Sequence, residues 1–242
     1  MVAHIQAQFE ADEQNCKAVY ASVGAAGTLP DEVVSLYERQ YASIARELPN
    51  YAAEVAAGLY VACRKHLVLG IASLFRRYSA QAFRETRAAV EAAGIAGAIR
   101  RDEESFRIFR EDRDEASRKA ARKRFKPATL FVGEMTRLQT YYDKASELSH
   151  TNRRTFGPHV DFGEKTFSYQ DLRDQDIPRL AINYLIWICA AHLTILEMAD
   201  FVFPDARGDL ATRFRAERQY LGEKICRFDL QNRGRLYEPG GG

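Results

Sequence analysis

Three stretches of this chain carry a pattern of apolar positions that is typical of buried helices. In the stretch after Asn50, one helical face is formed by Val55, Leu59, Ala62, His66 and Leu69. In the stretch after Pro127, the repeat consists of Phe131, Met135, Leu138, Tyr142, Ala145 and Ser149. Spacings of three and four residues place side chains on one face of an α-helix. We therefore predict core helices at about 50–78 and 128–150, and a third at about 178–203, where the chain is almost continuously apolar.

The third stretch resembles a membrane span in composition. Residues 180–196 carry no formal charge, but these 17 residues fall short of the roughly 20 that a span needs. Asn183, His192 and Thr194 interrupt the run, and Glu197 and Asp200 follow at its end, where lipid would make carboxylates costly. We interpret the segment as a central helix that is buried on nearly all sides, and we expect no membrane contact.

The remaining pattern predicts an all-α fold. Prolines divide the chain into helix-sized pieces, since proline disfavours helix interiors. Residues 28–31 have capping-box spacing and open a predicted helix that runs to about Leu48. We predict a single domain at 1–238, formed by one bundle of six to eight helices, and a flexible tail at 239–242. A loop-rich insertion at 151–177 has room for a short β-hairpin, because apolar residues alternate on either side of Gly163.

Composition narrows the class of protein further. An apolar content of 46% excludes a disordered chain, and 35 basic against 33 acidic residues excludes a histone-like one. The four cysteines form no C-x-x-C pair, and the first ten residues hold no apolar signal-peptide core, so we expect a cytoplasmic protein. Phosphate-loop, dinucleotide and H-E-x-x-H motifs are absent from the sequence, and we expect neither a cofactor nor a metal site.

The charge is unevenly distributed. Residues 100–126 hold 11 basic and 7 acidic side chains and few large apolar ones, which predicts a solvated helix or helical hairpin. Its densest basic run is a candidate site for the phosphates of RNA or DNA, and consists of Arg118, Lys119, Arg122, Lys123, Arg124 and Lys126. The alternative is a solvated helix end whose basic side chains complement the helix dipole.

A second candidate site lies where the predicted 128–150 helix gives way to a polar loop. His150 ends the helix, and Arg153 and Arg154 follow in the loop. An imidazole and a cation close to solvent suit acid–base chemistry on a phosphodiester. The alternative is a histidine that caps the last helical carbonyls, a position that the helix dipole favours.

A helical bundle with a histidine at a helix end resembles the HEPN superfamily, small helical domains common in bacterial toxin and abortive-infection systems. The resembling residues are the Tyr142-x-x-x-Ser146-x-x-x-His150 pattern and a preceding helix with Arg84, Arg87 and Glu91. The family's ribonuclease pattern is Arg, four to six residues, then His. Lys144 stands six residues before His150, and the literal match from Arg154 to His159 contains Gly157 and Pro158. The resemblance implies a homodimer.

Two functional hypotheses follow. The first is a HEPN-like bundle that serves as a nucleic-acid- or protein-binding module of a bacterial defence or mobile-element system, a setting that only the resemblance implies. The second is a metal-independent ribonuclease that uses His150 with Lys144 or Arg154.

Overall fold

Helices account for almost all of the chain that the structure describes. A computed structural model describes residues 2–111, 114–149, 160–161, 166–167 and 177–237. The long helices are α1 (Val2–Val23), α2 (Leu29–Ile44), α3 (Tyr51–Phe75), α4 (Ser79–Arg101), α10 (Ile182–Val202) and α12 (Arg215–Tyr237). The shorter ones are α5 (Glu103–Arg110), α6 (Glu115–Arg124), α7 (Pro127–Leu130), α8 (Gln139–Ser149) and α11 (Arg207–Arg213). The predicted all-α bundle is confirmed, with ten α-helices of seven or more residues in this part of the chain rather than six to eight.

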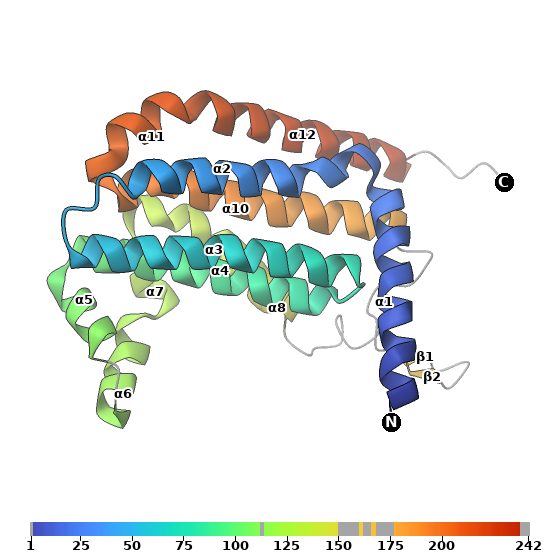
Figure 1. Cartoon of the computed structure of the whole chain (residues 1–242), viewed down its shortest axis with the longest axis horizontal. Coiled ribbons are helices and arrows are strands. Elements are labelled where there is room, and N and C mark those ends of the chain that lie inside the picture. Colours follow the sequence, from blue (N-terminus) through green and yellow to red (C-terminus); the bar gives the residue numbers. More distant parts are fainter. Residues whose placement is uncertain (1, 112–113, 150–159, 162–165, 168–176, 238–242) are drawn as a thin grey trace.

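α10 lies at the centre of the bundle and packs against α2, α3, α4 and α12 (Figure 1). Fourteen of its residues are buried, including residues on all sides of the helix. Both α3 and α10 are long and apolar enough to cross a membrane. In α10, 72% of the most apolar window is buried inside the protein, as predicted for a central core helix, whereas in α3 only 33% is buried.

α3 and α4 form the closest helix pair. The Asn50 side chain caps α3 by accepting a hydrogen bond from the Ala53 amide (3.0 Å), and the turn into α4 places Arg77 in the left-handed region, with φ 69°. The buried face of α3 includes Ala53, Ala56, Ala57, Tyr60, Cys63, Leu67 and Gly70. The predicted stripe beginning at Val55 lies beside this face and is only partly buried or exposed. Small side chains decided which face is buried, because they let α4 approach closely.

The prediction of one continuous helix at 128–150 is wrong. The segment consists of α7, the 3₁₀ helix η2 (Gly133–Leu138) and α8, and the break falls at Gly133, whose φ is +58°. Every member of the predicted apolar repeat is nevertheless buried. The bent segment packs against α4 at Gly94 and Gly97, where a Cβ atom would lie 3.1 Å from Leu130 and 3.2 Å from Met135. These glycines therefore admit the segment, and α4 continues through them to Arg101.

Three further segments complete the fold. α1 runs steeply across one end of the bundle (Figure 1). The π-helical turn η5 (Ile177–Ala181) leads into α10, and the 3₁₀ turn η6 (Pro204–Ala206) leads into α11. The expected β-hairpin is present in minimal form: β1 (Val160–Asp161) pairs antiparallel with β2 (Thr166–Phe167), with Val160 opposite Phe167. The rest of the insertion and the 239–242 tail lie outside the described residues.

Candidate nucleic-acid interface

α5 and α6 form a helical hairpin that projects from the bundle, here called the α5–α6 arm (Figure 1). Asp102 caps α5 by accepting a hydrogen bond from the Ser105 amide (2.8 Å). Arg124, at the end of α6, donates to the Asp102 carboxylate (2.7 Å) and to the Ser105 hydroxyl (2.8 Å). Phe109 and Phe125 meet edge to face with ring centroids 6.2 Å apart. The arm is thus held at its base by a charged hydrogen-bond network and along its length by one aromatic contact.

The carboxyl group at the base of the arm is ionised at neutral pH. Partial burial raises the pKa of Asp102, but the hydrogen bonds from Ser105 and Arg124 outweigh that effect and lower the pKa below its usual value. Arg124 is therefore occupied by a structural contact. Of the six basic residues predicted to bind nucleic acid, it is the one that the structure turns toward the protein.

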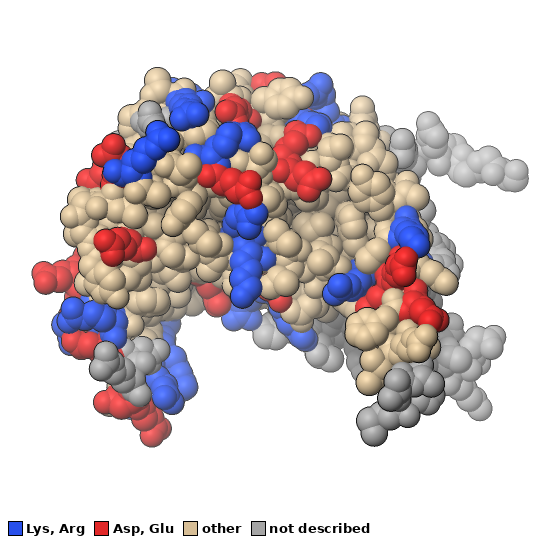
Figure 2. All heavy atoms as spheres, viewed as in Figure 1, with Lys and Arg blue, Asp and Glu red and all other residues tan. Residues whose placement is uncertain are grey.

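The other five basic residues remain in solvent. No residue of α6 is buried, and the side chains of Arg118, Lys119, Arg122, Lys123 and Lys126 are exposed. Within the described residues, none of these five forms an ion pair. Figure 2 shows Lys and Arg side chains on the arm beside acidic ones. The acidic residues Asp114 and Glu115 lie at the start of α6, where Asp114 forms a capping box with Ser117.

Four of the five basic residues inside α6 share a face. At about 100° per residue, positions 118, 119, 122 and 123 span roughly 140° of the helix circumference, whereas Arg124 points to the opposite side. A single helix therefore directs Arg124 toward α5 and presents four cations together outward. The pairs Arg118–Arg122 and Lys119–Lys123 are each one turn apart, which suits contacts with successive phosphates.

A second polar cluster joins α4 to the end of α8. Arg84 Nε donates to the Ser149 carbonyl oxygen (3.3 Å), and Arg87 donates to the Tyr142 hydroxyl (3.0 Å) and to Glu91 (3.4 Å). The Arg87 guanidinium also lies 5.1 Å from the centre of the Tyr142 ring. Between these contacts the Ser146 hydroxyl is buried without a hydrogen-bond partner among the described residues. Of the α4 residues in the resembling pattern, Arg84 therefore contacts the last residue before His150, and Arg87 contacts α8 at Tyr142.

Of the three predicted catalytic residues, the structure describes Lys144 alone. Lys144 is on the exposed side of α8, where it pairs with Glu147 (3.2 Å), whereas Tyr142, Ala145 and Ser149 form the buried side. His150 and Arg154 lie outside the described residues. The sequence contained Arg84 and Arg87 at helical spacing, but nothing in it indicated that they contact α8, because that contact depends on how the helices pack.

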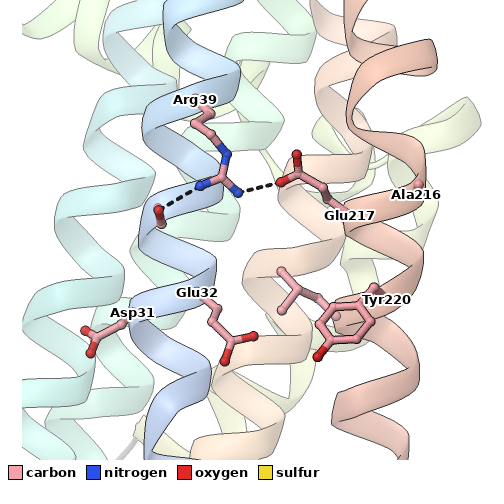
Figure 3. Close-up of a pocket in the computed structure, with 8 residues that line it drawn as sticks. Asp31, Glu32, Arg39, Ala216, Glu217 and Tyr220 are labelled. Atoms are coloured by element: carbon pink, nitrogen blue, oxygen red, sulfur yellow. Dashed lines mark hydrogen bonds and ion pairs between the residues drawn. The ribbon is translucent and has the colours of Figure 1, made fainter.

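A groove of about 560 Å³ lies between α2 and α12 (Figure 3). Arg39 pairs with Glu217 across it, and Lys224 pairs with Glu32 nearby. These two ion pairs link the helices and occupy most of the charged groups around the groove. Asp31 and the exposed ring of Tyr220 remain along its length. We assign the groove to helix packing.

The core holds several buried titratable groups. The His192 imidazole is fully buried, and its Nδ1 lies 3.1 Å from the Tyr37 hydroxyl. Burial lowers the pKa of His192 to about 3, and it raises the pKa values of Tyr37 and Tyr60. Burial also raises the pKa of the Cys63 thiol to about 12, which makes this thiol unreactive at neutral pH. Burial therefore keeps all four side chains of this cluster uncharged at neutral pH.

Comparisons with known proteins add no family to this geometry. No protein-family model, curated protein or solved structure matches the chain. Among the described residues, no three His, Cys, Asp or Glu side chains are grouped as metal ligands would be. The charged surfaces of the bundle are therefore the features from which a function is inferred.

Proposed function

We propose that the protein is a nucleic-acid-binding module whose contact surface is the exposed basic face of α6. The observation that carries the proposal is the contrast within one short helix. Arg124 is tied to Asp102, while its neighbours Arg122 and Lys123 are exposed and form no ion pair with a described residue. Exposed cations without carboxylate partners are free to replace the counterions of a phosphate backbone.

The projecting position of α6 supports the same proposal. The helix packs mainly against α5, so its basic face stands clear of the bundle and is accessible to a long polymer. Contacts of this kind go to phosphates and carry no base sequence information. A cytoplasmic location is part of this proposal. So is the bacterial defence or mobile-element setting, which only the HEPN resemblance implies.

Replacing four α6 cations with glutamine should abolish most of the salt-dependent affinity. If the wild-type protein contacts four to five phosphates, its affinity for a labelled duplex should weaken by about 150- to 500-fold between 50 and 200 mM salt. The Arg118→Gln/Lys119→Gln/Arg122→Gln/Lys123→Gln variant should lose about three to four from the slope of log affinity against log salt. Fluorescence anisotropy with labelled RNA and DNA measures both quantities.

A matched control has the same total charge change at scattered exposed sites. These sites are Arg46, Arg179, Arg215 and Arg227, each replaced by glutamine. The control variant should keep nearly all of the wild-type salt slope. Equal loss in both variants, or binding that is unchanged in the α6 variant, would show that α6 is not the contact surface.

A metal-independent ribonuclease is the second candidate function, and the contact between Arg84 and Ser149 favours it. This contact brings a guanidinium to the helix end that immediately precedes His150. In such an enzyme His150 would take the proton of a ribose 2′-hydroxyl, which attacks the adjacent phosphodiester and expels the 5′-oxygen, and a cation would stabilise the charge on phosphorus oxygens. The sequence analysis predicts that this stabilising cation is Lys144 or Arg154.

His150→Ala should lower RNA cleavage in EDTA by about 10²- to 10⁴-fold if His150 is the general base. Labelled single-stranded RNA and gel analysis of the products measure the rate. Lys144→Gln should have a smaller effect, because Lys144 pairs with Glu147 on the exposed side of α8. Cleavage that His150→Ala leaves intact would rule out this active site without bearing on binding by α6.

A further inference from the structure

The outward face of α3 is unusual for a surface helix. Its exposed positions recur at spacings of three and four from Tyr51 to Val68, and Leu69 beside Val68 is exposed as well. The recurring positions are Tyr51, Glu54, Gly58, Val61, Lys65 and Val68. The four large apolar side chains on this face are each 41–59% exposed. α3 lies on the near side of the bundle in Figure 1, and the same view in Figure 2 shows a broad, mostly uncharged surface below the charged rows of α2 and α12.

No packing contact among the described residues accounts for the glycine at position 58. A glycine in a helix interior costs about 1 kcal/mol relative to alanine. At Gly70, on the opposite face of α3, a Cβ atom would lie 3.3 Å from the Ala82 carbonyl oxygen, so that glycine admits α4. At Gly58 a Cβ atom would meet nothing within 4 Å. Its small size suits the close approach of a helix from outside the chain.

The two charges on this face are complementary under a two-fold rotation. Glu54 and Lys65 are both exposed, and neither forms an ion pair within the described residues. They are three helical turns apart on the same face. Consider two copies of the chain whose α3 helices pair antiparallel, with the two-fold axis midway between them. Glu54 of each copy then lies opposite Lys65 of the other, so the charge pair forms twice.

The same rotation matches the apolar positions. Gly58 of one copy lies opposite Val61 of the other, which places a residue without a side chain against a branched one. Tyr51 of one copy and Val68 of the other lie at the same level on opposite edges of the contact, and both are apolar and exposed. Charge and size therefore match around one axis, as an isologous interface requires.

We propose that the outward face of α3 is the contact surface of an antiparallel homodimer. A membrane surface fits less well, because Glu54 and Lys65 lie within the apolar face rather than along its edge. One helix face is smaller than a standard interface, so we expect a Kd of about 1–100 μM.

The charge pair gives the sharpest test. Glu54→Lys or Lys65→Glu alone should weaken dimerisation at least about tenfold, since each places like charges in contact twice. The double variant Glu54→Lys/Lys65→Glu should restore the wild-type Kd to within about threefold, because the pair is exchanged rather than lost. Sedimentation equilibrium of the full chain gives the Kd. Glu223→Lys on α12 is the control for charge reversal and should change nothing.

Gly58→Leu provides an independent test in which misfolding cannot be mistaken for dissociation. The new side chain has free space in the monomer and removes a helix-breaking glycine, so the thermal stability of the monomer should rise. The same side chain blocks close approach, so the dimer should dissociate. A wild-type protein that is monomeric at several hundred micromolar, a dimer that all three single variants leave intact, or a monomer that instead binds lipid vesicles through this face would overturn the proposal.

Discussion

Arg218→Ala should destabilise the protein by about 3–5 kcal/mol, the largest effect that we expect from a single substitution. Arg218 is 5% exposed and forms two parallel hydrogen bonds with the Asp200 carboxylate, at 2.9 and 2.8 Å. It also donates to the carbonyl oxygens of Leu196 (3.0 Å) and Leu210 (3.1 Å). One guanidinium therefore joins α10, α11 and α12.

The cost arises because the partner is left behind. With Arg218 removed, the Asp200 carboxyl group is left in a site that is 18% exposed without its bidentate donor. Asp200→Ala should cost a similar amount for the reciprocal reason. Replacing both residues, as in Arg218→Met/Asp200→Ala, should cost clearly less than the sum of the two single changes, since no buried charge remains unpaired.

Urea unfolding of the single and double variants measures these free energies as a double-mutant cycle. Lys17→Ala is the control, because the side chains of the Lys17–Glu13 pair are 74% and 68% exposed, so that solvent screens the pair and its loss should change the stability very little. If Arg218→Ala and Lys17→Ala cost the same, the buried ion pair does not stabilise the junction of the three helices.

The second large effect is a loss of stability in mild acid that comes from His192. Burial lowers its pKa from 6.5 to about 3 in the folded protein. Between these two values the unfolded chain binds one more proton than the folded one, so stability falls as the pH falls. At pH 4.5 the loss relative to pH 8 should be about 2–3 kcal/mol, and above about pH 7.5 this histidine contributes almost no pH dependence.

The contribution of one histidine is separated from other groups by a variant that has no buried imidazole. Tyr37→Phe/His192→Phe replaces both partners of the buried contact by apolar rings, so neither a hydroxyl nor an imidazole is left alone in the core. Its unfolding free energy should fall by about 2–3 kcal/mol less than that of the wild-type protein between pH 8 and 4.5. His66→Gln is the control for a partly exposed histidine paired with Glu85. Equal acid sensitivity of the wild-type and double variants would mean that His192 is not kept neutral by burial.

The hydrophobic pattern located the helices well because helix formation depends mainly on local spacing. The starts of α3 and α10 and the buried repeat after Pro127 follow from it. The pattern was less successful in predicting which face of a helix is buried and where a helix is interrupted. Val55 and Leu59 were predicted at the buried face of α3, but alanine and glycine occupy that face because α4 comes close there. The break at Gly133 was missed because the apolar repeat continues across it.

The candidate sites divide in the same way. The six basic residues of 118–126 were found from the sequence, since a run of like charges is a local property. That Arg124 is held by Asp102 while the others stay free depends on the fold of the arm. The contact of Arg84 with the end of α8 joins residues 65 positions apart, and no local pattern encodes it.

The sequence by itself determined that this protein is a helical bundle with a buried central helix and a basic, solvated segment, because helical periodicity and charge density are properties of neighbouring residues. Only the tertiary structure decided which cations remain free on α6, which arginines meet α8, and that α3 presents Gly58, Glu54 and Lys65 on one unpartnered face. Those outcomes depend on how closely distant helices approach one another, and that distance is set by the packing of side chains across the whole bundle.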